Sequence, residues 1–422
     1  MVNDIFLLKK KNLFYQNKRF KFTLFFSPII VIPSVLVVLS SFLIQSVQRQ
    51  FTRTDAINHF VFGCLGYLIA ILISYIPLQR IKSYVIPAYF LSLLCLSLLY
   101  LFGISVYGAQ RWLSFGLFTF QPSEIAKLST LLILALVLDK NNIQSIKDLF
   151  LPFVLAIIPW TLIFFQPDLG TSLVLIFLFF VMIYWAQAPV EWILIVFLSI
   201  GTAIFSALST YINFVWIPFI GFLAYKSFKN KKIFTILTVF VHTLIANLTP
   251  FLWDVGLKDY QKNRLILFLD PSKAPFDGGY HLIQSKIAIG SGGFFGTGFL
   301  NGKLTNLKFI PEQHTDFIFS ALGEELGFVG SCLVVSLFLF LIIKLINIAK
   351  NARSDFESLV VIGIASIFLF QIIINIYMTV GLGPVTGIPL PFMSYGRTSL
   401  IINFICIGLA LSTLKRSRSL RS

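Results

Sequence analysis

The chain has 422 residues, of which 57% are hydrophobic and 12% are charged, and its mean hydropathy is +0.88. This composition excludes disordered, collagen-like, coiled-coil and disulfide-scaffold proteins, and it is far more apolar than that of a soluble domain. Lys and Arg outnumber Asp and Glu by 33 to 17. In so apolar a chain, this excess favours membrane orientation over nucleic-acid binding. Any acid that the chemistry needs must come from those 17 carboxylates.

Twelve apolar runs are candidates for membrane helices, since a span needs roughly 20 mainly apolar residues. They lie near 22–47, 59–78, 84–106, 124–138, 149–165, 170–187, 192–209, 212–225, 233–252, 326–348, 359–378 and 399–414. Thr210–Asn213 must then be a tight turn, and the short run after it holds Pro218, so a re-entrant or tilted segment is an alternative there. The sequence therefore predicts an all-α polytopic membrane protein with about 10–12 transmembrane helices.

The positions of the basic residues predict the orientation. With the N-terminus inside, 21 of the 33 Lys and Arg residues fall in inner loops and at the two ends of the chain. This satisfies the positive-inside rule with an even number of spans and both termini in the cytoplasm. We therefore expect a basic cytoplasmic N-terminus, a first group of spans, an extracytoplasmic catalytic loop, three last spans and a basic cytoplasmic tail, at 1–21, 22–252, 253–323, 324–414 and 415–422.

Two motifs stand at predicted helix entrances. Gln121–Glu124 has the order of a helix start, but Glu124 and Lys127, three residues apart on one face, also enter the membrane. Intramembrane charges are usually paired and functional. The second motif, Gln166–Ser172, has ordinary turn chemistry around Asp168, and a functional role is the weaker interpretation.

The long loop and the helix after it contain most of the candidate catalytic residues. The glycines of 290–298 do not follow a predicted strand, which excludes a dinucleotide fingerprint, and the chain has no phosphate-binding P-loop motif. Further on, ionisable residues are dense at a membrane boundary: Glu312, His314, Asp316, Glu324 and Glu325. Carboxylates there have raised proton affinity, which suits a general base, and a divalent cation is an equally permitted use. The stretch 381–396, rich in Pro and Gly, is expected to pack against this loop because irregular backbone at membrane depth must be buried.

Six motifs in this order resemble the SEDS family (shape, elongation, division and sporulation) of peptidoglycan glycosyltransferases, and within it the RodA branch. The motifs cover nearly the whole chain: GAQRW…FQPSEIAK (108–127), QPDLGTS (166–172), GGYHLIQSKIAIGSGG (278–293), PEQHTDFIF (311–319), GEELG (323–327) and GIPLPFMSYG (387–396).

The resemblance implies an enzyme that polymerises lipid II, the undecaprenyl-linked disaccharide-pentapeptide, into glycan strands for cell-wall elongation and rod shape. It implies that Asp316 activates the acceptor 4-hydroxyl, as a base or as a carboxylate that orients a divalent cation (Mg or Mn). Undecaprenyl pyrophosphate would be the leaving group. The expected substrate-binding residues are Arg111, Trp112, Glu124, Lys127, Gln166, Asp168, Arg264, Gln284, Lys286, His314, Glu324 and Ser394.

The resemblance also implies partners and a location. A class B penicillin-binding protein transpeptidase, the elongation machinery and membrane lipid are the expected partners, with no nucleic acid. The expected location is the bacterial cytoplasmic membrane, with the active site on its outer face. A lipid II transporter is the rival function and a scaffold for the transpeptidase a further role, although the chain shows no internal repeat of the kind that transporters have.

The chain departs from the family pattern at three places. Ala274 stands at the position of a second loop aspartate, and Arg397 follows Ser394–Gly396 where the family has a glycine. The family also has ten spans, so the two extra predicted spans indicate an inserted hairpin at 192–232.

Overall fold

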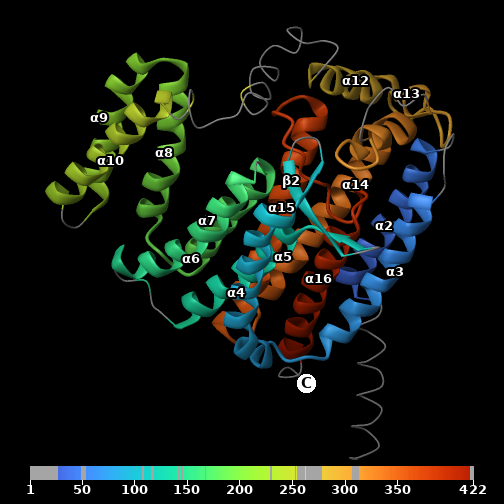
Figure 1. Cartoon of the computed structure of the whole chain (residues 1–422), viewed down its shortest axis with the longest axis horizontal. Coiled ribbons are helices and arrows are strands. Elements are labelled where there is room, and N and C mark those ends of the chain that lie inside the picture. Colours follow the sequence, from blue (N-terminus) through green and yellow to red (C-terminus); the bar gives the residue numbers. More distant parts are fainter. Residues whose placement is uncertain are drawn as a thin grey trace, which may run out of the picture.

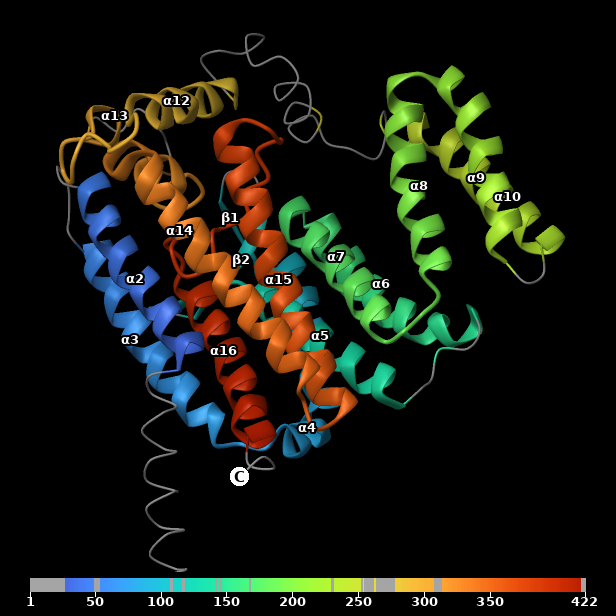
Figure 2. The same ribbon diagram turned by 180° about the vertical axis from the view of Figure 1, so that it is seen from behind.

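The computed structural model describes residues 27–48, 54–106, 109–115, 118–140, 143, 146–166, 168–228, 231–251, 253, 262, 278–306 and 313–418. Figures 1 and 2 show these residues as a mainly helical molecule seen from its two sides. Apolar residues dominate the helices on every face, as expected where lipid rather than water surrounds the protein.

All twelve predicted apolar runs are confirmed as helices. Their bounds are α2 Pro28–Val47, α3 Thr54–Ser74, α4 Leu78–Phe102, α5 Pro122–Lys140, α6 Phe150–Phe165, α7 Leu169–Trp185, α8 Val190–Leu208, α9 Asn213–Ser227, α10 Lys231–Phe251, α14 Ile318–Lys350, α15 Asp355–Val380 and α16 Arg397–Arg418. Within the described ranges, nine helices are long and apolar enough to cross a membrane, and α7 is apolar but shorter. The chain is therefore an integral membrane protein with an all-α polytopic fold.

Shorter elements connect these helices. A small antiparallel sheet has the order β1–β2–β3, with bounds Ile104–Val106, Ala109–Phe115 and Phe118–Phe120. The sequence predicts no strand in this stretch, because these strands are too short for a periodic pattern to stand out. The other short elements are η1 Ile146–Leu149, η2 Thr210–Ile212, α12 Gly278–Ser291 and α13 Lys303–Asn306.

The helices form a bundle with α15 near its centre, where it packs against α5, α7, α14 and α16. Close packing is possible because Gly363 of α15 leaves room for Leu131 of α5 and Leu178 of α7. Helices α12 and α13 lie across one end of the bundle, and the C-terminus lies at the opposite end (Figures 1 and 2). We call these the α12 end and the opposite end.

Helix α14 is kinked at Gly327, where φ is 65° and ψ is −162°. The kink separates a short helix, beginning at Ile318, from the long span that follows. The short helix begins inside the stretch 253–323 predicted as a loop, and the predicted start of the span near 326 coincides with the kink. The turn 292–298 lies against the kink, since the N–H groups of Thr297 and Phe328 donate to the carbonyls of Glu324 and Gly293 at 2.9 and 3.0 Å.

Helices α8, α9 and α10 form a separate three-helix unit beside α6 and α7 (Figure 2). The turn predicted at Thr210–Asn213 is confirmed as η2 followed by the start of α9. Polar side chains join the unit internally: the Thr202 hydroxyl lies 2.7 Å from Nδ1 of His242 and accepts from Nε1 of Trp216 at 3.1 Å.

Candidate active site at the α12 end

Asp316 lies in the turn 313–317 that precedes α14, at the α12 end of the bundle. It is half-buried, and a β-carbon built on Gly387 would lie 3.4 Å from its Oδ2 atom. Buried Asn375 of α15 donates to the carbonyls of Asp316 and Ile388 at 2.9 and 2.8 Å. One amide group therefore joins the Asp316 turn to the loop that carries Gly387.

His314 is joined to the loop before α16. Its carbonyl accepts from the N–H of Tyr395 at 2.9 Å, and the two rings lie 5.8 Å apart. Burial, together with the nearby Asp55 carboxylate, raises the pKa of Tyr395 against the opposing effect of Arg397. Tyr395 is therefore neutral at physiological pH.

Glu124 and Lys127 form the buried ion pair that their spacing predicted. The Lys127 Nζ to Glu124 Oε1 distance is 2.8 Å, and both side chains are almost fully buried in α5. The second oxygen of Glu124, Oε2, has no hydrogen-bond partner. A buried pair with an unsatisfied oxygen is costly for stability alone, which favours a functional use.

Asp168 caps the N-terminus of α7, as the turn interpretation of this motif requires. Its carboxylate accepts from the N–H of Thr171 at 3.2 Å and from its hydroxyl at 2.8 Å. The same carboxylate also accepts from Gln121 and Ser123, at 3.4 and 3.5 Å, so the QPDLGTS and QPSEIAK motifs meet here. Gln166 is buried and donates to the carbonyl of Leu96 at 2.8 Å, which is a structural contact.

Gly170 connects this region to the loop around Gly387. A β-carbon at Gly170 would lie 2.9 Å from the carbonyl oxygen of Thr386 and 2.8 Å from Cγ1 of Ile388. The N-terminus of α7 thus packs directly on the loop against which the Asp316 carboxylate lies. Because of this contact, motifs more than 200 residues apart in the sequence meet at one end of the bundle.

Helix α12 brings a further motif to Asp316. The His281 ring stacks on that of Phe317, with centroids 6.0 Å apart and planes 11° apart. The Ser285 hydroxyl donates to the carbonyl of Thr379 at 2.7 Å. Lys286 is exposed, and its side chain lies over Gly381 at the end of α15. Gln284 is half-buried on the same helix.

Glu324 is a buried capping residue. Its carboxylate accepts from the N–H of Leu304 and from the N–H and hydroxyl of Thr305, at 2.8, 2.8 and 2.5 Å. These contacts join α14 to α13 and explain why Glu324 is buried. Its neighbour Glu325 accepts from the hydroxyl of Ser46 in α2. The expected contact of Glu324 with substrate stays a prediction.

The remaining expected site residues have these positions. Ser394 is buried, and its hydroxyl accepts from the N–H of Leu390 at 2.7 Å, which closes the turn before Tyr395. Arg111 and Trp112 are half-buried on β2, where Trp112 pairs with Ile104 of β1. Arg264 and Ala274 lie outside the described residues.

The sequence analysis did not include Asn375, Gly387 or Tyr395 among the site residues. A signal for Asn375 was present, since the apolar run of α15 contains two amides, Gln371 and Asn375, and polar groups are unusual at membrane depth. Gly387 and Tyr395 lay inside a quoted motif, but the contacts that bring them to Asp316 and His314 depend on the fold.

A resident metal fits the described residues poorly. No group of three or more His, Cys, Asp or Glu side chains capable of holding a metal ion occurs among them. Asp316 alone would be an incomplete ligand set for a divalent cation, which takes six or more oxygens.

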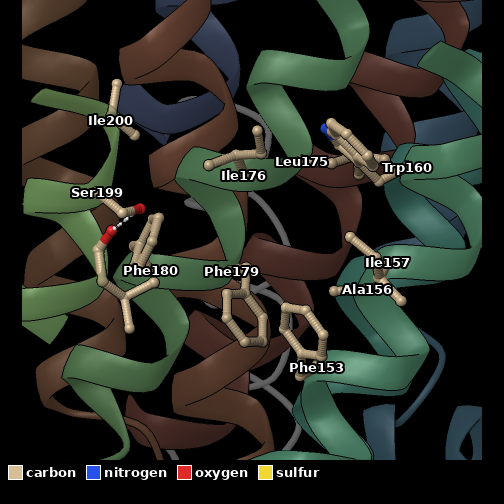
Figure 3. Close-up of a pocket in the computed structure, with 11 residues that line it drawn as sticks. Phe153, Ala156, Ile157, Trp160, Leu175, Ile176, Phe179, Phe180, Ser199 and Ile200 are labelled. Atoms are coloured by element: carbon tan, nitrogen blue, oxygen red, sulfur yellow. Dashed lines mark hydrogen bonds between the residues drawn. The ribbon is translucent and has the colours of Figure 1, made fainter. Parts of the chain in front are cut away.

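Two cavities lie away from this site. One, of about 220 Å³, is enclosed by aliphatic and aromatic side chains between α6, α7 and α8, and Trp160, Phe179 and Phe180 point into it (Figure 3). Its lining includes one hydroxyl, that of Ser199, which donates to the carbonyl of Val196 at 2.6 Å. The other, of about 800 Å³, is polar and lies at the opposite end, next to Asp139 and Trp185. Neither lining includes an expected site residue.

Comparison with known proteins identifies the family of this chain. The sequence profile of the FtsW/RodA/SpoVE family, described as cell cycle proteins, matches residues 20–239 and 219–419. The peptidoglycan glycosyltransferase MrdB of Escherichia coli K12 is 34% identical over 349 residues, which cover 82% of each chain. The peptidoglycan glycosyltransferase RodA of Treponema pallidum is 33% identical over 385 residues, covering 85% of this chain and 89% of the relative.

Solved structures share the fold. A chain from a study of polymerisation and crosslinking by a peptidoglycan synthase complex superposes with a TM-score of 0.70 at 27% identity, covering 92% of this chain and 97% of the other. The rod shape determining protein RodA of Thermus thermophilus gives a TM-score of 0.60 at 26% identity, covering 92% and 96%. This chain is a member of the FtsW/RodA/SpoVE family and an integral membrane glycosyltransferase.

Proposed function

We propose that this protein polymerises lipid II into the glycan strands of peptidoglycan, for cell-wall elongation, with Asp316 as the catalytic base. The relatives and structural neighbours named above support peptidoglycan as the product. The observation that carries the role of Asp316 is its position: it is a half-buried carboxylate on a turn that contacts the motifs at 278–293 and 387–396 and Asn375 of α15.

The proposed step is a single displacement. Asp316 takes the proton of the acceptor sugar 4-hydroxyl as its oxygen forms a bond to the anomeric carbon of the donor. The bond from that carbon to the pyrophosphate oxygen breaks, and undecaprenyl pyrophosphate leaves with the electron pair. A positioned general base contributes about 10²- to 10⁴-fold to such a step.

The leaving group needs positive charge near its phosphates. Lys286 is exposed on α12, and His281 of the same helix stacks on Phe317, the residue after Asp316. We assign to Lys286 the role of placing positive charge near the phosphates of the leaving group. Lys127 forms the buried ion pair with Glu124. We assign to this pair the role of binding the polar head of the substrate at the α12 end.

We further propose that the protein works with a class B transpeptidase in the bacterial cytoplasmic membrane, together with the elongation machinery. The complex named for the first structural neighbour supports such a partner. The distribution of basic residues supports cytoplasmic termini and an active site on the outer face, at the α12 end.

A divalent cation as cofactor stays a proposal. The described residues include no group of three or more His, Cys, Asp or Glu side chains that could hold such an ion. Measuring polymerisation across a titration of Mg²⁺ or Mn²⁺, with chelator at the zero point, tests whether the reaction depends on either ion.

The test is polymerisation of purified lipid II by the chain in complex with its transpeptidase. We expect wild-type protein to give a ladder of glycan products on a gel, and Asp316→Ala and Asp316→Asn to reduce the rate at least about 100-fold. Asp355→Ala is the matched control, because Asp355 is an exposed carboxylate in the first turn of α15, at the opposite end.

Polymer formation that survives Asp316→Ala contradicts the assignment of the base. A wild-type complex that makes no polymer but moves lipid II across a liposome membrane contradicts the polymerase and supports transport instead.

A further inference from the structure

Asn375, near the end of α15, hydrogen-bonds to two segments that are far apart in the sequence. Its side-chain nitrogen, Nδ2, donates to the carbonyl oxygen of Asp316 at 2.9 Å and to that of Ile388 at 2.8 Å. Both partners can only accept, so the nitrogen of the amide, and not its oxygen, faces them. The two hydrogens of one amide group therefore bind the backbone of the proposed base and the backbone of the loop before α16.

That loop reaches the Asp316 carboxylate beside the residue that Asn375 holds. Gly387 comes directly before Ile388, and a β-carbon on Gly387 would lie 3.4 Å from Oδ2 of Asp316. The loop is supported from another side by α7, since Gly170 packs against Ile388. Asn375 thus couples the position of the carboxylate to the position of the loop that lies against it.

Helix α15 gives this side chain a fixed position. The helix packs against α5, α7, α14 and α16, and Asn375 is fully buried in the bundle (Figure 2). The segments that it joins are a turn, 313–317, and an irregular loop, 381–396. Backbone groups of irregular segments have no helical partners, so side chains often satisfy them. The bonds of Asn375 therefore fix both segments relative to a packed helix.

The oxygen of the same amide shows which of its groups matters. Among the described residues, buried Oδ1 of Asn375 has no hydrogen-bond partner. A buried acceptor without a partner destabilises a fold. An apolar side chain of similar volume would avoid this loss, so the two donors explain why an asparagine lies here.

We propose that Asn375 is a positioning residue for the reaction, which holds Asp316 in the orientation, and at the distance from the loop 381–396, that proton transfer needs. The inference rests on the proposed role of Asp316 as base. The position of a reacting group matters closely, since a displacement of about 1 Å can lower a rate about 100-fold. Asn375 acts through the backbone and does not contact the substrate.

The experiment measures kcat and KM of lipid II polymerisation for Asn375→Leu, Asn375→Ala and Asn375→Gln, each in complex with the transpeptidase. The temperature is well below the unfolding midpoint of every variant, so that lower stability alone does not lower the rate. Asn375→Leu removes both donors at similar volume, and we expect kcat to fall about tenfold or more, with KM within about twofold of wild type. Asn375→Gln keeps both donors on a longer side chain and should retain more activity than Asn375→Leu.

Two control variants each remove a buried side-chain hydrogen bond that does not involve the Asp316 turn. Thr379→Val removes a hydroxyl one turn further along α15, which bonds within its own helix to the carbonyls of Asn375 and Ile376 at 3.0 and 2.9 Å. Ser412→Ala removes a bond between elements, from α16 to the carbonyl of Ile76 at 2.6 Å, towards the opposite end. We expect both variants to keep wild-type kcat, and Ser412→Ala to unfold at a lower temperature.

Three results overturn the proposal: wild-type kcat in Asn375→Leu; a rise in KM that accounts for the whole loss of kcat/KM; or an equal loss of kcat in either control variant. If Asn375→Leu does not fold, Asn375→Ala, which removes the same two donors, carries the comparison.

Asp316→Ala, measured in parallel, separates this inference from the proposed function. An active Asp316→Ala refutes the base itself, and the positioning role with it. An inactive Asp316→Ala beside a fully active Asn375→Leu refutes only the positioning role.

Discussion

At the scale of single residues, Gly387 lies directly against the Asp316 carboxylate. Its φ of 73° lies in the left-handed region, which an L-residue with a β-carbon occupies at a cost of roughly 1–2 kcal/mol. A β-carbon there would also lie 3.4 Å from Oδ2 of Asp316, in van der Waals contact with that oxygen. Glycine at this position is therefore favoured by the backbone, and a substitution there would place a new group against the Asp316 carboxylate.

We expect Gly387→Ala to lower kcat for polymerisation about tenfold, because relief of the strained positive φ shifts the loop that lies against the Asp316 carboxylate. The measurement is the steady-state rate with lipid II, alongside the thermal unfolding midpoint in detergent. Gly383→Ala is the control in the same loop. Gly383 has no positive φ, and the nearest atom to its β-carbon would be Cβ of Tyr377 at 3.6 Å. Equal rates for the two variants would show that Gly387 places no constraint on Asp316.

At the scale of elements, the kink of α14 and the turn 292–298 pack closely, backbone against backbone. A β-carbon on Gly292 would collide with the carbonyl oxygen of Gly323, and one on Gly296 with that of Glu325. The turn donates to the carbonyls that the kink at Gly327 leaves without helical partners. This contact fixes the short helix that begins two residues after Asp316.

The contact between the turn and the kink can be tested at Gly292, with Gly290, two residues earlier, as the control. Gly292→Ala should destabilise the fold by about 1–3 kcal/mol through overpacking, and it should lower activity because the short helix shifts. Gly290→Ala should leave both unchanged, since a β-carbon at Gly290 meets nothing within 4 Å and the residue lies in helix α12. Thermal unfolding and the polymerisation rate check both variants. A Gly292→Ala variant with wild-type stability and wild-type activity would mean that the turn shifts without cost and does not support α14.

The sequence predicted the helices well and the contacts between motifs poorly, for a physical reason. Long apolar runs specify helices directly, because a membrane leaves the backbone few other structures. The ion pair of Glu124 and Lys127 was equally predictable, since both lie on one helix face. The roles of Glu324 and Ser394 as capping residues, and the contact of Tyr395 with His314, depend on how distant segments pack, which a single sequence does not display.

At the scale of the whole molecule, the helices divide into a bundle that holds the site and the unit α8–α10 beside it. Of the bundle helices, α7 makes the main contact with this unit, and the apolar cavity of Figure 3 lies along the boundary. The unit is held together by its own polar contacts, among them the bond of the Ser206 hydroxyl to the carbonyl of Ala246 at 2.5 Å. It covers the predicted insertion at 192–232, and none of the expected site residues lies in it.

Because the unit α8–α10 is separate from the bundle that holds the site, we expect that destabilising the unit leaves catalysis unchanged. His242→Ala removes the partner of Thr202 and should destabilise the unit by about 1 kcal/mol, the scale of a hydrogen bond between membrane helices. Hydrogen exchange followed by mass spectrometry should show faster exchange in peptides of α8–α10 and unchanged exchange in α14–α16, with kcat equal to wild type. Thr243→Ala is the control, because Thr243 is exposed and bonds only within its own helix, to Val239 at 2.7 Å. A loss of kcat in His242→Ala but not in Thr243→Ala would instead show that the unit is coupled to the site through α7, despite the cavity between them.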